Sequence, residues 1–160
     1  GIIDALYDAS RAGVRIDLIV RGVCALRPGI EGVSERIRVR SVVGRFLEHH
    51  RVFYFYADGK ERVLLGSADW MERNFFRRIE VAFPILDRKL KRRVINEGLR
   101  VYLADNQQAW EMDANGGYHP RRAATRGKPV CAQEESIALL VYSEDGASEE
   151  RAKPDKGEVE

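Results

Sequence analysis

The stretch LEHHRVFYFYADGKERVLLGSADWMERNFFRRIE, residues 47–80, carries the pattern that decides the fold. An aromatic run at 52–56, a turn signal at 57–60 and a returning apolar segment predict a β-hairpin. His49 and Arg51 lie just before this hairpin, and a small polar turn and a basic pair follow it. Chemistry on phosphate uses an imidazole together with fixed cations. The order of these residues therefore indicates a site that handles phosphoryl groups.

Helix and strand patterns alternate before this stretch. Apolar residues recur at helical spacing from the first residues up to Gly13, and residues 14–20 alternate as a strand does. A loop at 21–33, a strand at 37–43 and a brief helical turn at 44–50 follow. Because the first helix opens without a cap of its own, we expect this chain to be a piece of a longer protein.

The second half continues the alternation. Asp69 is expected to cap a short helix that runs to about Phe75. A strand at 79–85 and a helix at 87–104, with one apolar stripe, come next. Residues 105–129 mix Asn, Gly, Arg and Pro, which indicates a loop. Strands that alternate with helices predict an α/β sandwich with a mixed β-sheet flanked by helices.

The end of the chain differs in composition from the rest. A last helix is predicted at 133–142. Residues 143–160 are acidic and contain no aromatic side chain, so this tail is expected to be disordered. The sequence therefore predicts one domain at 1–142, with its motif region at about 44–74.

The composition excludes several classes of protein. A net charge of +2 over 160 residues gives no global basic field for nucleic acid, although arginines crowd 11–51 and 73–100. These arginines suit a local site for an anion, or simply a solvated surface. Two distant cysteines, Cys24 and Cys131, indicate neither a zinc site nor a disulfide framework. No apolar run spans a bilayer, so a cytoplasmic location is expected, with membrane association left open.

Aromatic side chains allow two interpretations. The run at 53–56 and Trp70 could form a platform that stacks on a nucleotide base. Aromatic residues on one strand more often serve the core and cross-strand pairing, and we expect a core role here.

Several motifs, taken in order, resemble a known family. His49, Arg51 and the turn at 66–69 are similar to the phospholipase D-type pattern H-x-K-x(4)-D followed by G-S-x-N. Arginine stands where lysine is usual, and Tyr56 stands where the pattern has its aspartate. These departures, together with the segments VRGVCALRPG (20–29), RFLEH (45–49), SADWM (67–71) and RN (73–74) through Pro84, resemble the C-terminal, phospholipase D-like domain of bacterial polyphosphate kinase. The resemblance covers residues 1 to about 142.

The resemblance and the residue chemistry together name the candidate site. His49 is the candidate catalytic residue, because an imidazole exchanges protons near neutral pH and the family pattern places its histidine here. Arg21, at the end of the first strand, and Arg78 match phosphate contacts of the family, and each guanidinium can fork two phosphate oxygens. Either arginine could instead be structural. His50, which the pattern leaves variable, is expected to point away from His49.

Four residues complete the motif in supporting roles. Glu80 is expected to orient His49 or an arginine, although pairing with Arg78 is the competing interpretation. The other three, of which two also suit turns and caps, are Arg51, Ser67 and Asn74.

The resemblance implies reversible transfer of the terminal phosphate of ATP to polyphosphate through a phosphohistidine. It implies that the phosphorylated histidine and the Mg²⁺ ligands belong to domains outside this chain. This chain would pair with those domains, and the full-length enzyme would form homo-oligomers. His49 would then contact a nucleotide phosphate and act as a general acid. Two alternatives stay open: a phospholipase D-type phosphodiesterase that pairs two copies, and a non-catalytic polyanion-binding domain.

Overall fold

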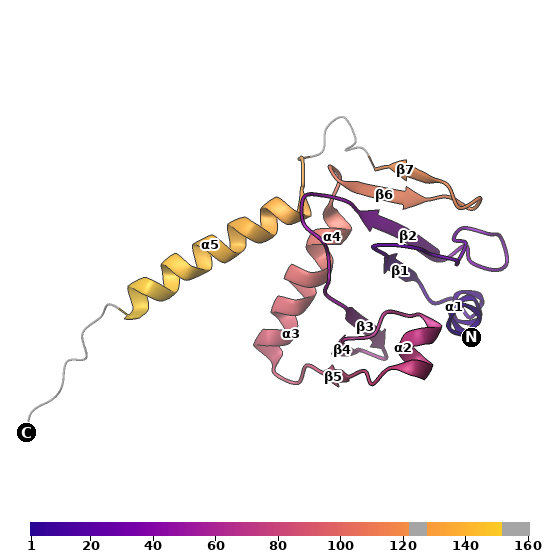
Figure 1. Cartoon of the computed structure of the whole chain (residues 1–160), viewed down its shortest axis with the longest axis horizontal. Coiled ribbons are helices and arrows are strands. Elements are labelled where there is room, and N and C mark those ends of the chain that lie inside the picture. Colours follow the sequence, from indigo (N-terminus) through magenta and orange to yellow (C-terminus); the bar gives the residue numbers. More distant parts are fainter. Residues whose placement is uncertain (122–127, 152–160) are drawn as a thin grey trace, which may run out of the picture.

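The computed structural model of the chain describes residues 1–121 and 128–151. Thirteen elements follow one another in the described part, which mixes helices and strands as the sequence predicts (Figure 1). They are α1 (Ile2–Arg11), β1 (Ile16–Ile19), β2 (Ile37–Val42), β3 (Val52–Ala57), β4 (Lys60–Gly66), α2 (Glu72–Arg77), β5 (Ala82–Pro84), α3 (Arg88–Ile95), the π-helix η1 (Asn96–Arg100), α4 (Val101–Ala104), β6 (Ala109–Met112), β7 (Tyr118–Pro120) and α5 (Ala132–Arg151).

The larger sheet is mixed and has the strand order β1-β2-β6-β7. β1 and β2 are parallel, with Ile16 opposite Ile37, whereas β6 and β7 add antiparallel neighbours. Leu26, Ile37 and Val39 are buried in the core of this sheet, and apolar residues of α1 pack against them. The carboxyl end of β1 lies near the start of β3, because residues of both line one cavity.

The smaller sheet contains the hairpin that the sequence predicts. β3 and β4 pair in register from Val52 opposite Leu65 to Ala57 opposite Lys60, and β5 adds a third antiparallel strand. At the turn, Asp58 and Gly59 have φ angles of 49° and 71°. Positive φ at both central residues is the type I′ geometry that matches the twist of a two-residue hairpin, which explains the Asp-Gly pair.

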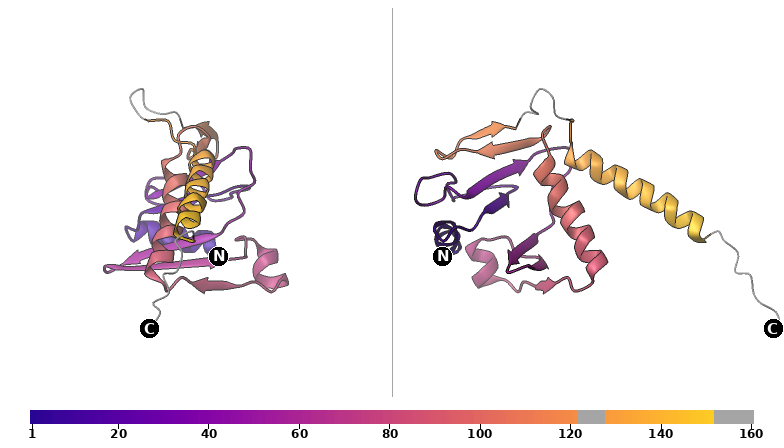
Figure 2. Two further views of the ribbon diagram at one scale, coloured as in Figure 1. Left: turned by 90° about the vertical axis from the view of Figure 1, so that its left-hand side faces the viewer. Right: turned by 180° about the vertical axis from the view of Figure 1, so that it is seen from behind.

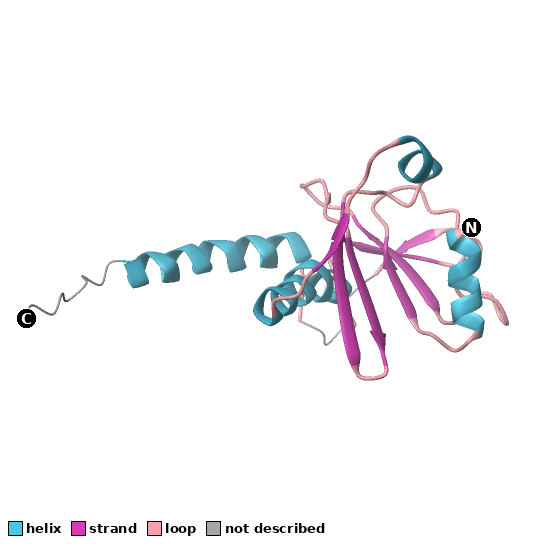
Figure 3. Cartoon of the chain, turned by 90° about the horizontal axis from the view of Figure 1, so that it is seen from below, coloured by secondary structure: helices cyan, strands magenta, loops and turns pink. Residues whose placement is uncertain are grey.

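One long helical segment spans the two sheets. α3, η1 and α4 follow each other without a break, so the helix predicted at 87–104 is confirmed, with a π-helical stretch inside it (Figure 1). Asp87 caps its start by accepting a hydrogen bond from the backbone N–H of Leu90 at 2.8 Å. At its far end the Leu103 carbonyl accepts from buried Arg40 of β2. Figure 3 shows the strands of both sheets between α1 and this segment.

Several local predictions are wrong, each for a tertiary reason. Residues 44–50 form no helical turn, since the Gln133 side chain takes both backbone groups of Phe46. The strand predicted at 79–85 is confined to β5, and the short helix is α2, with Met71 rather than Asp69 as its N-cap.

The segment 105–129 was predicted as a loop but contains β6 and β7. Their connection is a turn in which the Asp113 carboxylate accepts hydrogen bonds from the backbone of Asn115 and Gly117. Gly116 has a φ of 87°, which glycine adopts without strain. The strands are short and have no strong pattern of their own: β6 extends the sheet by pairing with β2, and β7 pairs with β6.

The last helix is longer than predicted. α5 continues from Ala132 to Arg151, into the segment that the sequence assigns to a disordered tail, and it projects from the rest of the fold (Figures 1 and 2). Residues 152–160 of that tail lie outside the described residues. Within residues 132–141 of α5, for which the structure describes side chains, only Ala132 and Gln133 are buried, and Ala132 joins the core of Val42, Tyr102 and Ala109. Within the described part of the chain, no helix is long and apolar enough to cross a membrane.

A single carboxylate ties α4, β6 and α5 together. Asp105 is fully buried, and it accepts hydrogen bonds from the backbone N–H groups of Gln107, Gln108, Ala109 and Ala132 at 2.7–3.0 Å.

Asp105→Ala should therefore lower the free energy of unfolding by about 3 kcal/mol or more, because buried donors lose their acceptor. Asp87→Ala is the control and should cost only about 1 kcal/mol, as an exposed helix cap does. Urea unfolding measures both, and equal losses would contradict this role.

Candidate functional site

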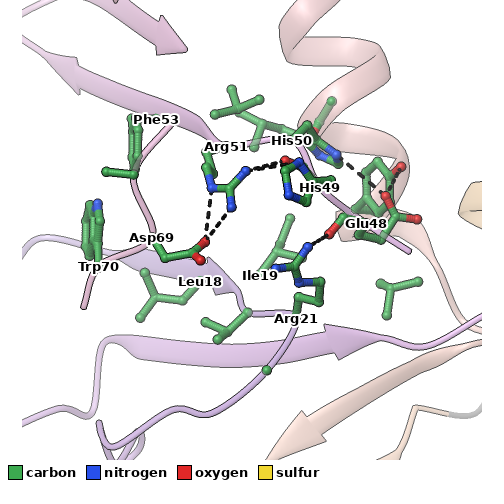
Figure 4. A pocket seen from close by; sticks show the side chains of 18 of the residues that line it. Leu18, Ile19, Arg21, Glu48, His49, His50, Arg51, Phe53, Asp69 and Trp70 are labelled. Carbon is green, nitrogen blue, oxygen red and sulfur yellow. Dashed lines mark hydrogen bonds and ion pairs between the residues drawn. The ribbon is translucent and has the colours of Figure 1, made fainter. Parts of the chain in front are cut away.

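The candidate site is a cavity of about 340 Å³ at the carboxyl end of β1, where the two sheets meet (Figure 4). The end of β1, the loop before β3, the turn after β4 and the η1–α4 junction form its walls. Open α/β sheets place ligands at the carboxyl ends of their strands. Three predicted site residues line it together: Arg21, His49 and Arg51.

The loop between β2 and β3 carries His49 and has no regular secondary structure. Gln133, which is buried at the start of α5, fixes this loop from behind. Its Oε1 accepts from the Phe46 N–H at 3.1 Å, and its Nε2 donates at 2.8 Å both to the Phe46 carbonyl and to the Glu48 carboxylate. Gly44 lies directly against this contact, since a Cβ there would come within 2.4 Å of the Gln133 amide oxygen. The position of the loop therefore depends on a residue 85 positions beyond Glu48.

Glu48 joins this support to the first strand. Its carboxylate accepts from the Tyr102 hydroxyl at 2.8 Å, and its backbone carbonyl accepts from Arg21 Nη1 at 2.6 Å. Burial, and then the hydrogen bond to Glu48, raise the pKa of Tyr102 to about 12. The hydroxyl thus remains a donor over the physiological pH range.

Arg21 keeps most of its donors for a ligand. Among the described residues it forms no ion pair with a carboxylate, and its hydrogen bond goes to the neutral Glu48 carbonyl. An uncompensated guanidinium on the wall of a cavity attracts anions, above all those that accept two parallel hydrogen bonds.

Arg51 is committed to protein partners. Its Nε and Nη2 lie 3.0 and 2.9 Å from Asp69 Oδ1. Its Nη1 lies 2.7 Å from the His49 carbonyl and 3.2 Å from His49 Nδ1 (Figure 4). Asp69, expected to be a helix cap, is instead the counter-ion of Arg51. The sequence contained a signal for this role. Arginine replaces the lysine, and aspartate replaces the asparagine, of the phospholipase D-type pattern.

His50 turns toward the helices, as the alternation of an extended segment predicts. Its Nε2 lies 3.1 Å from the Gly98 carbonyl, and its ring packs against Tyr102 with the centroids 4.9 Å apart. His50 Nδ1 lies 3.5 Å from the Glu48 carboxylate. Adjacent histidines thus have different surroundings, and only His49 contacts Arg51.

Ser67, Asn74 and Glu80 form a separate cluster beside the cavity. Glu80 accepts hydrogen bonds from the Ser67 hydroxyl and, at 2.6 Å, from the Asn74 amide. These bonds, Ser67 first, hold the pKa of Glu80 below its usual range, and the charges of Arg78 and Arg51 act in the same direction. The hydrogen bonds of Glu80 go to this cluster rather than to His49, and its orientation of His49 or an arginine stays a prediction.

Arg78 is exposed at the end of α2 and is not part of the cavity lining. Of the three residues predicted to contact phosphate, the cavity therefore contains Arg21 and His49 but not Arg78. Arg78 lies near enough to Glu80 to lower its pKa.

The aromatic residues divide between two environments. Phe53 and Trp70 stack at the cavity wall, with ring centroids 5.4 Å apart and planes 3° from parallel. Tyr54, Phe55 and Tyr56 are exposed, so the core role predicted for the whole run is wrong for these three. Because consecutive strand residues point to opposite faces, both faces of the small sheet are accessible at this part of β3.

Metal binding receives no support from the side chains that the structure describes. Residues 1–121 and 128–151 contain no group of three or more His, Cys, Asp or Glu side chains that could hold a metal ion. Cys24 and Cys131 are both free thiols.

Comparison with known proteins gives one consistent result. The family model "Polyphosphate kinase C-terminal domain 2" matches residues 1–133. A polyphosphate kinase of Burkholderia multivorans is 70% identical over 129 residues, which are 81% of this chain and 18% of that protein. One of Paraburkholderia phytofirmans is 68% identical over 121 residues, 76% of this chain and 18% of that protein.

A solved structure is similar as well. The crystal structure of polyphosphate kinase from Porphyromonas gingivalis matches with a TM-score of 0.84 and 43% identity, over 91% of this chain and 22% of that one. This match confirms the predicted α/β, phospholipase D-like architecture. The chain spans about a fifth of the length of the curated relatives that it matches.

The Tyr102–Glu48 contact makes stability depend on pH. Tyr102 has its pKa raised from 10.0 to about 12 in the folded state, so its contribution is complete below pH 10 and is lost as the pH rises toward 12. Wild type should therefore lose more unfolding free energy than Tyr102→Phe between these two pH values, as measured by urea unfolding at each pH. Parallel curves for the two proteins would show that Tyr102 does not hold Glu48 in this way.

Proposed function

Because the chain belongs to the family of the polyphosphate kinase C-terminal domain, we propose that it supplies one wall of the active site of such an enzyme. The reaction is the reversible transfer of the terminal phosphate of ATP to a polyphosphate chain. Arg21 and His49 bind the phosphate groups in the cavity at the end of β1. The observation that carries this proposal is the Arg21 guanidinium, which has no carboxylate partner among the described residues and lines the same cavity as His49.

Each step of the proposal uses a property of these residues. Arg21 holds phosphate oxygens in place, which supplies the positioning on which phosphoryl transfer mainly depends. His49 contacts the same phosphate and is the catalytic residue of this chain. Arg78 serves as a second phosphate contact once other parts of the enzyme extend the site, since its side chain is exposed and close to the Glu80 cluster.

The supporting residues act through others. Arg51 positions His49, and Ser67, Asn74 and Glu80 fix the turn after β4 against α2 and β5. None of these four needs to touch the substrate for the site to work.

The rest of the enzyme is proposed to supply what this chain lacks. The histidine that becomes phosphorylated lies on the preceding half, and the ligands of Mg²⁺ lie outside this chain, as the family resemblance implies. The full-length enzyme would act in the cytoplasm, or at the membrane surface, as a homo-oligomer. The domain itself ends near residue 142. Alone, this chain would bind nucleotide phosphates without turning them over.

Arg21→Lys in the full-length enzyme tests the proposal. An ammonium keeps the charge but cannot hold both the Glu48 carbonyl and a forked phosphate. The affinity for a non-hydrolysable ATP analogue should fall about tenfold or more, since a lost charge-assisted hydrogen bond costs about 1.5 kcal/mol or more. Titration calorimetry measures this.

Arg62→Lys is the matched control, because Arg62 is exposed on β4 and is not part of the cavity lining. It should bind the analogue as wild type does. If Arg21→Lys also binds like wild type, Arg21 is a structural residue and the cavity is not the phosphate site.

A further inference from the structure

Arg51 gives His49 an unusual partner for a histidine in a phosphoryl-transfer site. Its Nη1 lies 3.2 Å from His49 Nδ1 and 2.7 Å from the His49 carbonyl. Asp69 binds the opposite edge of the same guanidinium at 2.9–3.0 Å. The Arg51 side chain is largely buried, at 16% exposure, so this edge cannot readily turn away from the histidine.

The chemistry of the guanidinium decides which nitrogen of His49 carries the proton. A guanidinium has only donors and does not lose its proton in a protein. The Arg51–His49 contact can therefore form only if Nδ1 is bare and accepts. In a neutral imidazole, the remaining proton must then lie on Nε2.

From this geometry we propose that the Arg51–Asp69 pair holds His49 as a neutral ring that donates a hydrogen bond from Nε2 to a phosphoryl oxygen and transfers no proton. Its action on a phosphoryl oxygen rests on the proposed function. A second proton on Nδ1 would point at an N–H of Arg51, and loss of the Nε2 proton would leave an imidazolate anion. The first change is unfavourable beside a guanidinium, and the second is unfavourable because a neutral imidazole is a very weak acid. The general-acid role expected from the sequence is thereby replaced by hydrogen bonding to developing negative charge.

The same contact excludes a nucleophilic role for His49. A carboxylate on Nδ1 would hold a proton there and leave Nε2 bare for attack, as in triads that use histidine as a base. Arg51 imposes the opposite tautomer. Arg51 and Asp69 stand where the phospholipase D-type pattern has lysine and asparagine. In the structure these two residues form one ion pair.

The tautomer can be measured on the 160-residue chain without any substrate. The chain has three histidines, so ¹⁵N-labelled imidazoles can be assigned with His50→Gln and His119→Gln variants. At about pH 8.5, where an ordinary imidazole is neutral, His49 should carry its proton on Nε2 alone. Arg51→Met should allow both tautomers of His49, whereas the control Arg62→Met should change nothing.

Some outcomes would overturn the inference at this stage. A proton on Nδ1 of His49 in the wild-type chain would do so, as would a tautomer that Arg51→Met leaves unchanged. If Arg51→Met fails to fold because Asp69 is left unpaired, the double variant Arg51→Met/Asp69→Asn removes that carboxylate and gives the same readout.

Turnover by the full-length enzyme distinguishes a hydrogen-bond donor from a general acid. His49→Ala should reduce kcat about 10²- to 10³-fold, as loss of a donor to developing charge does. Glutamine can place an N–H near the position of Nε2 but cannot transfer a proton at neutral pH. His49→Gln should therefore recover about tenfold or more of that loss, with an unchanged pH profile.

A His49→Gln variant as slow as His49→Ala, together with a wild-type rate that falls as the pH rises through the imidazole range, would establish a general acid and overturn the inference. If both variants keep the wild-type rate, the proposed function of the cavity fails instead. The NMR measurement then still decides the tautomer.

Discussion

The site depends on how one irregular loop satisfies its backbone. The loop between β2 and β3 has no regular secondary structure, and its backbone joins the sheets at its two ends, where Val43 donates to Gln108 and Arg51 accepts from Gly66. Between these ends the backbone groups still need hydrogen-bond partners. Three side chains, two of them distant in sequence, supply such partners. Gln133 forms hydrogen bonds with the backbone N–H and carbonyl of Phe46. Arg21 donates to the carbonyl of Glu48, and Arg51 donates to the carbonyl of His49. Since the last two carbonyls flank the His49 ring, the orientation of the ring follows from the support of the loop.

Because of this constraint, the two arginines of the cavity, Arg21 and Arg51, have different roles. Asp69 neutralises Arg51, which leaves it as part of the frame. Arg21 contributes one donor to the loop and faces the cavity without a counter-ion among the described residues, so its charge remains for a ligand. Glu48 connects α4 and α5 to Arg21. Its side chain forms hydrogen bonds with Tyr102 of α4 and Gln133 of α5, and its carbonyl accepts a hydrogen bond from Arg21. A change in α5 can therefore reach the proposed phosphate site through a single residue.

Local patterns in the sequence predicted what local physics determines. The hairpin followed from its Asp-Gly turn and aromatic strand, and the long helix followed from its apolar stripe. The cavity position of Arg21 and His49 followed from the end of a strand and a motif. Partners distant in sequence were not predictable: nothing near Gln133 signals its contact with Phe46, 87 residues away. β6 and β7 were missed because they are short and form by pairing with β2 and with each other. Tyr54, Phe55 and Tyr56 point alternately to the two faces of the small sheet and all three are exposed, because strand composition does not determine whether either face is covered.

The cavity at the end of β1 is proposed to hold the phosphate groups between Arg21 and His49. A crystal structure of the full-length enzyme with a non-hydrolysable ATP analogue would show where these groups bind. Phosphate oxygens should lie within hydrogen-bond distance of both the Arg21 guanidinium and His49 Nε2, with the Arg51–Asp69 pair intact. Phosphates bound elsewhere, or held by Arg51 after it has left Asp69, would show that the proposed site is wrong.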